Sequence, residues 1–72
     1  MIQVDMADED LRLRKLIEHW AEHNDEHGGR FEEEAEKASE RGLKEVADNL
    51  RAAAKKAAEV SRALRKALEA FS

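Results

Sequence analysis

Three histidines lie four residues apart in the first half of the chain. They are His19, His23 and His27, and the acids Glu22 and Glu26 lie between them. Residues four apart in an α-helix lie one turn above each other, so adjacent imidazoles can point at one small volume. Neutral imidazoles at this spacing are common metal ligands, and a nearby carboxylate can complete or orient such a site. These five side chains therefore predict a site for a divalent transition metal: nickel, zinc, cobalt or copper.

Two metalloenzyme classes use related motifs, and the chain fits neither class. H-x-x-E-H occurs twice, overlapping, and is the inverted form of a zinc-protease motif. A protease also needs a cleft and a further downstream ligand, for which 72 residues are too few. The Glu-x-x-His motif of di-iron bundles is absent, because Leu16, Trp20 and Asn24 precede the histidines by three. The chain has no cysteine, nucleophile elbow or phosphate loop, so we expect no enzymatic activity.

A purely structural interpretation of the histidines stays open. In it, His27 packs in the core, and His19 and His23 are partly exposed helix residues. The chain would then be a homodimerisation or protein-interaction domain without a metal. The two interpretations differ in one observable property, which is stabilisation by metal that vanishes when the histidines are replaced.

Two long helices are predicted to position these residues. Proline is absent and only three glycines occur, which favours uninterrupted helices. Asp8 suits the N-cap of the first helix. Gly42 suits the left-handed residue that ends a helix, and Leu43 can supply the apolar contact that follows it. The sequence predicts helices over about 8–41 and 43–70, with residues 1–7 as a flexible tail and 8–72 as one helical hairpin domain.

Gly28 and Gly29 offer an alternative break inside the first helix. Two glycines cost roughly 2 kcal/mol relative to alanines in a helix interior. The apolar stripe nevertheless keeps its phase from Trp20 to Ala38 across them, which favours one continuous helix. A three-helix bundle broken at these glycines is the alternative.

Folding the chain back at Gly42 gives an all-α antiparallel hairpin in which residue 42−k meets roughly residue 42+k. Residues 18–40 carry a net charge of −7 and residues 51–66 one of +5, so the acidic stretch would lie along the basic one. Two helices leave apolar surface uncovered, so we expect a homodimer that forms a four-helix bundle. The expected core or interface residues are Leu16, Trp20, Phe31, Leu50, Leu64 and Leu68.

Charge and hydropathy limit the other partners. The net charge of −4, with no aromatic residues among the basic ones, argues against nucleic acid. No apolar run approaches 18 residues, so we expect no membrane span and a cytoplasmic location. A second protein remains an open partner.

The string HWAEHNDEH at 19–27, with Phe31, Ala35 and the Gly42-Leu43-x-x-Val46-Ala47 turn, resembles a group of small, uncharacterised prokaryotic helical domains. These domains carry an H-W-x-E-H-N-x-E-H signature and are loosely associated with nickel. The resemblance spans about residues 11–70 and is specific at 19–27. It implies a helical hairpin and a metal-linked role. Gly28 and Gly29 depart from the group, which has good helix formers at these two positions.

Overall fold

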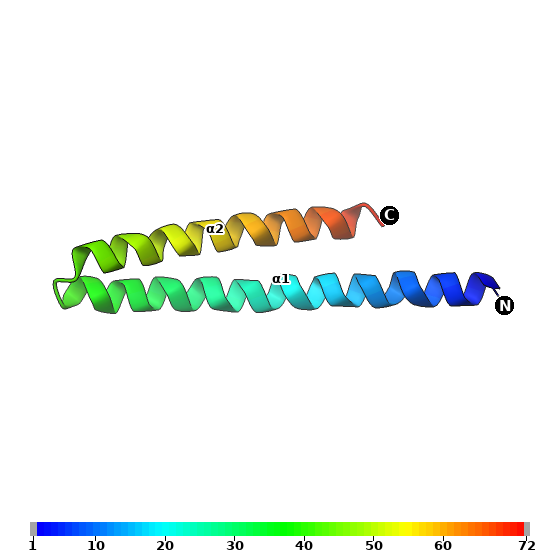
Figure 1. Cartoon of the computed structure of the whole chain (residues 1–72), viewed down its shortest axis with the longest axis horizontal. Coiled ribbons are helices and arrows are strands. Elements are labelled where there is room, and N and C mark those ends of the chain that lie inside the picture. The colour runs from blue at the N-terminus through cyan, green and yellow to red at the C-terminus, as the bar shows by residue number, and fades with distance from the viewer. Residues whose placement is uncertain (1, 72) are drawn as a thin grey trace.

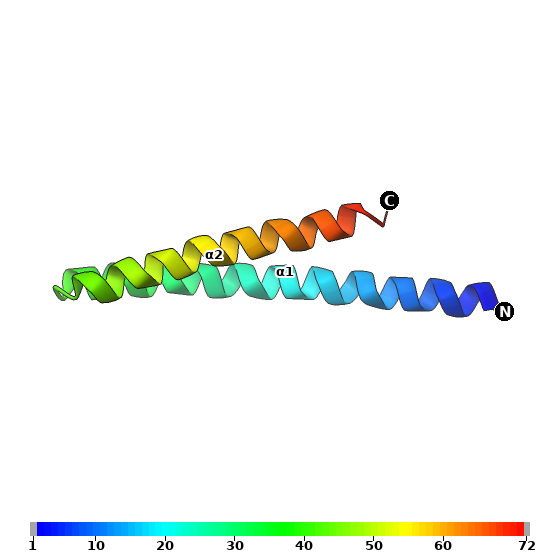
Figure 2. The ribbon, with the colours of Figure 1, turned by 45° about the horizontal axis from the view of Figure 1, so that its top comes forward.

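Two antiparallel helices joined by a short turn make up the fold (Figure 1). The computed structural model describes the backbone of residues 2–71 and the side chains of residues 8–71. Helix α1 spans Ile2–Glu40 and helix α2 spans Lys44–Glu69. The hairpin measures 61 × 15 × 12 Å, and the helices cross at a shallow angle (Figure 2). The predicted all-α antiparallel hairpin is confirmed.

Helix α1 begins earlier than the sequence predicted. The predicted start at Asp8 was wrong, because the helix already includes Ile2. Neither proline nor glycine precedes Asp8, and an aspartate inside a helix costs well under 1 kcal/mol, so its capping preference does not stop the helix. The N-terminal end of α1 extends beyond the end of α2 (Figure 1). The side chains of residues 1–7 lie outside the described part of the chain, and the flexibility expected of this tail stays a prediction.

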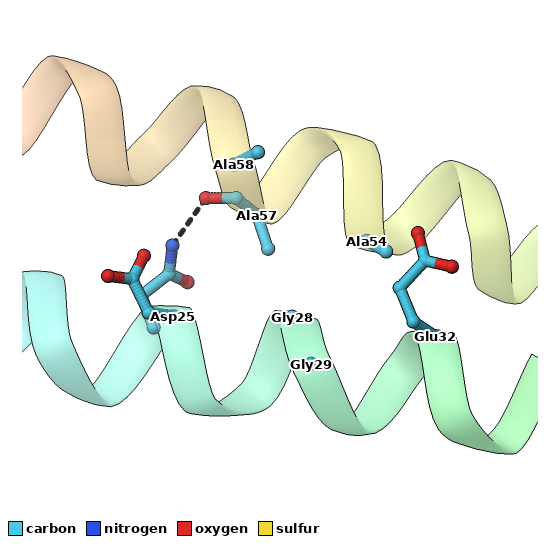
Figure 3. A pocket seen from close by; sticks show the side chains of 8 residues that line it. Asp25, Gly28, Gly29, Glu32, Ala54, Ala57 and Ala58 are labelled. Carbon is cyan, nitrogen blue, oxygen red and sulfur yellow. Dashed lines mark hydrogen bonds between the residues drawn. The ribbon is translucent and has the colours of Figure 1, made fainter.

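Gly28 and Gly29 lie inside one continuous helix, so the three-helix alternative was wrong. Gly28 faces α2, and a Cβ atom added to it would lie 3.4 Å from the Cβ of Ala57 (Figure 3). Gly29 has nothing within 4 Å of such an atom. Packing of α1 against α2 before and after the glycines, at Ala21 and Ala35, offsets the weak helix propensity of the pair.

The turn has the geometry that the sequence predicted. Gly42 has a φ of 79°, in the left-handed region that glycine tolerates best. The amide of Leu43 donates to the carbonyl of Ala38 at 2.9 Å, and the amide of Gly42 donates to that of Ser39 at 3.0 Å. This pair of hydrogen bonds is the Schellman motif, which satisfies carbonyls at the end of α1.

The core repeats every seven residues, with alternating steps of three and four. This is the spacing of a left-handed coiled coil. The buried and half-buried residues at these positions are Ile17, Ala21, Asn24, Gly28, Phe31, Ala35 and Ala38 on α1, Ala47, Leu50, Ala54, Ala57, Ser61, Leu64 and Leu68 on α2, and Phe71 just after α2. Ala53 is also half-buried, one residue before Ala54. Small residues dominate the fully buried positions, which lets the helices approach closely.

The expected core set divides into two groups. Phe31, Leu50, Leu64 and Leu68 are half-buried at core positions. Leu16 and Trp20 are not core residues of the single hairpin, because they remain 42% and 48% exposed. Each precedes a core residue by one position, which turns it about 100° away from the seam between the helices. Their expected place in an interface between chains stays a prediction.

Candidate functional site

His23 and His27 form the closest pair of metal-ligating side chains in the candidate site. The Nε2 atoms of the two rings are hydrogen-bonded to each other at 3.1 Å, and the rings meet edge to face with centroids 4.5 Å apart. Both residues are exposed. Two imidazole nitrogens that share one tetrahedral ion, each at about 2.0–2.1 Å from it, lie roughly 3.3–3.4 Å apart. The pair therefore has nearly the spacing that chelation of one ion requires.

His19 takes a different place in the row. Its ring stacks on that of His23, with centroids 5.7 Å apart and an interplanar angle of 17°. His27 in turn stacks on the ring of Phe31 at 6.2 Å. The four rings form a ladder along α1, and Phe31 anchors one end of it in the core. The structure thus brings His23 and His27 together through their nitrogens and His19 through its ring face.

The two glutamates of the predicted site lie near different partners. The Oε1 atom of Glu26 lies 4.0 Å from Nδ1 of His23, the ring nitrogen opposite the one that faces His27. A carboxylate on this side of a metal-binding imidazole can orient the ring. Glu22 instead acts toward Arg65, whose pKa is raised mainly by its hydrogen bond with Asp25 and least by the charge of Glu22. Over residues 8–71, whose side chains the structure describes, no group of three or more acidic or histidine side chains is gathered that could hold an ion.

A polar layer in the core fixes the direction in which these histidines point. The Asn24 amide donates to the carbonyl of Ala57 and, at 2.8 Å, to the Ser61 hydroxyl. That hydroxyl donates to the carbonyl of Ala21 at 3.4 Å, and Ser61 is only 3% exposed. Sliding or rotating either helix would leave these buried groups without partners, so the layer specifies the register. Asn24 directly follows His23 and thereby holds that turn of α1 in place.

An ion pair links the helices beside this layer. Nη2 of Arg65 lies 2.7 Å from Oδ2 of Asp25, and both side chains are about half exposed. The hydrogen bond from Arg65 is the largest cause that holds the pKa of the Asp25 carboxyl below its usual 3.8. The same contact with Asp25 raises the pKa of Arg65.

The two long sides of the hairpin differ in chemistry. Four of the seven large hydrophobic residues that remain exposed precede a core residue by one position, and Leu13 lies one heptad before Trp20. This spacing places all five on one side of an antiparallel pair. We call this the apolar side, with Leu13, Leu16, Trp20, Val46 and Val60. His23 and His27 also precede core positions and therefore lie on it. The opposite, charged side holds Glu18, Asp25, Glu32, Arg51 and Arg65.

A shallow groove of about 350 Å³ crosses the charged side at the two glycines. Figure 3 shows Asp25 and Glu32 at its two ends, with Gly28 facing Ala57 between them. Alanines and glycines form most of its lining, and Asp25 is already held by Arg65. The groove therefore marks the close approach of the helices, whereas the metal-ligating side chains lie on the other side.

Comparison with known proteins identifies the family. Residues 13–71 match the family described as Domain of unknown function (DUF8180). The chain belongs to this family. An uncharacterized protein of Archaeoglobus fulgidus is 45% identical over 58 residues, which cover 81% of this chain and 92% of that protein. No solved structure matches.

The family match confirms part of the resemblance found in the sequence. The matched region contains the histidine row, the turn and all of α2. It supports a small helical domain with a prokaryotic relative. The H-W-x-E-H-N-x-E-H signature and the association with metal stay predictions. In the described residues, neither helix contains an apolar stretch long enough to cross a membrane.

Proposed function

We propose that the hairpin binds a divalent transition metal ion through His23 and His27, as a small non-enzymatic module for metal handling or sensing. The observation that carries the proposal is the 3.1 Å separation of the two Nε2 atoms on adjacent turns of α1. Imidazole nitrogens suit zinc, copper, nickel and cobalt, so the metal belongs to this group.

Three features of the surroundings support this proposal. Both rings are exposed, so an ion can reach the facing nitrogens without unfolding the hairpin. Glu26 lies on the far side of the His23 ring, where a carboxylate can orient an imidazole ligand. The Asn24 layer holds the same helical turn against α2, which reduces the ordering that metal binding has to impose.

A thermal melt with each metal tests the proposal. The unmodified chain is melted with EDTA and then with zinc, nickel, cobalt or copper at about 100 times the dissociation constant. Binding at that concentration adds roughly 2.7 kcal/mol to the free energy of unfolding. For a domain of this size the melting temperature should rise by about 10 °C or more.

The histidines of the row provide matched variants for this melt. His23→Ala and His27→Ala each remove one facing nitrogen and should abolish most of the shift. His19→Ala removes a similar exposed ring from the same helix and should preserve most of it. Equal losses in all three variants would contradict the assignment of the pair, and no shift with any of the four metals would refute metal binding.

The apolar side favours a second candidate function, a metal-free module that associates with another helical protein. Its half-exposed Trp20 and Val60 are typical of an interface rather than of a free surface. On this alternative metal leaves the melting temperature unchanged, and adding the helical partner raises it.

A further inference from the structure

The hairpin exposes more surface than a compact protein of its mass. Its accessible surface is 5953 Å² for 8.2 kDa. A compact monomer of this mass exposes about 4,500 Å², so the excess is about 1,400 Å². Each partner in a standard interface buries roughly 800 Å². The single hairpin therefore has enough uncovered surface for one full interface along a side.

The apolar side is where this interface belongs. Trp20 and Val60 are 48% and 49% exposed, and Leu13, Leu16 and Val46 are similarly open. Such a run of large apolar groups on a monomer marks an interaction site. The charged side already has its own ion pair across the seam, between Asp25 and Arg65.

The charges along α1 allow two copies of this side to meet. Residues 18–40 contain nine acids, but Glu34 is the single one that precedes a core position by one residue. Glu34 is close to Lys37, with a separation of 3.5 Å between Oε2 and Nζ. Arg30 lies on the same side of the helix. The acidity of this stretch is therefore turned away from the apolar side, and like-charge repulsion there is small.

The histidine pair identifies the occupant. A zinc-type ion takes four ligands, and His23 and His27 supply two. A two-fold axis brings the same patch of each chain against itself, so an axis beside these residues adds a second identical pair. We propose that a second copy of this chain covers the apolar side, and that one metal ion is shared between the hairpins, each of which supplies His23 and His27. This inference rests on the proposed metal binding.

Zinc stoichiometry and molecular mass, measured on the same samples, test the proposal. The chain is titrated with zinc ions by calorimetry and examined by analytical ultracentrifugation with zinc and with EDTA. The expected result is one zinc per two chains and, with zinc, a mass twice the 8.2 kDa of the chain. The emission of Trp20, the only tryptophan, should shift to shorter wavelength as the dimer covers it.

Two leucines of α1 provide a matched pair of variants. Leu16 lies on the apolar side and Leu11 lies off it, and they are 42% and 48% exposed. Leu16→Glu should weaken zinc-dependent dimerisation by more than about tenfold, because it brings two carboxylates into the interface. Leu11→Glu should dimerise as the unmodified chain does. Circular dichroism of both variants verifies that the helices are intact.

Three results would overturn the inference. One zinc per chain on a monomer, lost in His23→Ala, would reject the shared site while the proposed metal binding stands. Equal dimerisation of Leu16→Glu and Leu11→Glu would reject the apolar side as the interface. Absence of zinc binding at any concentration tested would reject the shared site together with zinc as the metal of the proposed function.

Discussion

The two sides of this hairpin flank the same core and are built from the same two helices, but they differ in what they leave open. On the charged side, Asp25 and Arg65 bridge the seam and satisfy each other. On the apolar side, Trp20 and Val60 remain about half exposed, and the facing nitrogens of His23 and His27 point to no other ligand of the described chain. One side is complete within the single chain, whereas the other is the side on which we propose that a second copy and a shared ion bind.

Forcing the helices apart should disturb both the charged and the apolar side, and it should lower the free energy of unfolding more than any other change considered. Ala35 is fully buried at the seam, so Ala35→Leu forces the helices apart. Overpacking of this kind costs about 1–3 kcal/mol. Ala52→Leu makes the same change at an exposed position of α2 and should be nearly neutral. Chemical denaturation of both variants measures the difference, and equal stabilities would contradict the close packing at Ala35.

Removing the polar layer should destabilise the hairpin and loosen the register of α1 against α2. Asn24→Ala leaves the Ser61 hydroxyl and the Ala57 carbonyl without their donor, at a cost of about 1–2 kcal/mol. Because the layer also fixes the turn that carries His23, metal affinity should fall as well. Urea unfolding and a zinc titration of this variant provide the measurements. Unchanged values in both would show that the layer does not specify the register.

Filling the groove on the charged side should stabilise the hairpin modestly. A Cβ atom on Gly29 meets nothing within 4 Å, so Gly29→Ala adds helix propensity without a clash. The expected gain is about 0.5–1 kcal/mol, seen as a higher denaturation midpoint with an unchanged slope. Metal affinity should be unaffected, because this position lies away from the histidine pair. A destabilised variant would contradict the open space at this residue.

Acid should weaken the ion pair on the charged side. The pKa of Asp25 is lower in the folded chain than its usual 3.8, so its ion pair stabilises the fold above that pH. This contribution is lost as pH falls through the lowered pKa. The difference in melting temperature between the unmodified chain and Asp25→Asn should therefore shrink from about pH 5 downward. A difference that does not change with pH would indicate that Arg65 contributes nothing through charge.

The sequence predicted the hairpin, its turn and its register well, because each depends on a local signal. Gly42 and Leu43 carry the turn chemistry, and folding about Gly42 pairs Gly28 with Ala57 within one residue of the observed contact. The start of α1 was missed because no strong breaker precedes Asp8 and propensity differences there are small.

The placement of Leu16 and Trp20 could not be predicted as accurately. A straight helix of 3.6 residues per turn drifts by about 20° per heptad from a repeat of 3.5. Over the length of α1, a stripe calculated at 100° per residue therefore includes both the core positions and the positions one residue before them. The hydrogen bonds of Asn24 depend on α2, and the contact of His23 with His27 depends on side-chain rotamers. Sequence periodicity contains information on neither. An asparagine in the apolar stripe that lies across from Ser61 is the one sequence signal of the polar layer.

The position of the turn has a kinetic consequence. Contacts near Gly42 close loops of a few residues, whereas the contact of Arg14 with Phe71, at 5.3 Å, closes one of nearly the whole chain. Loop-closure entropy grows with length, so the helices should zip from the turn outward and open from the far end first. Substitutions beside Gly42 should then slow folding, and those near Phe71 should mainly speed unfolding. The histidine pair lies between these ends, so binding an ion there would slow opening that begins at the far end.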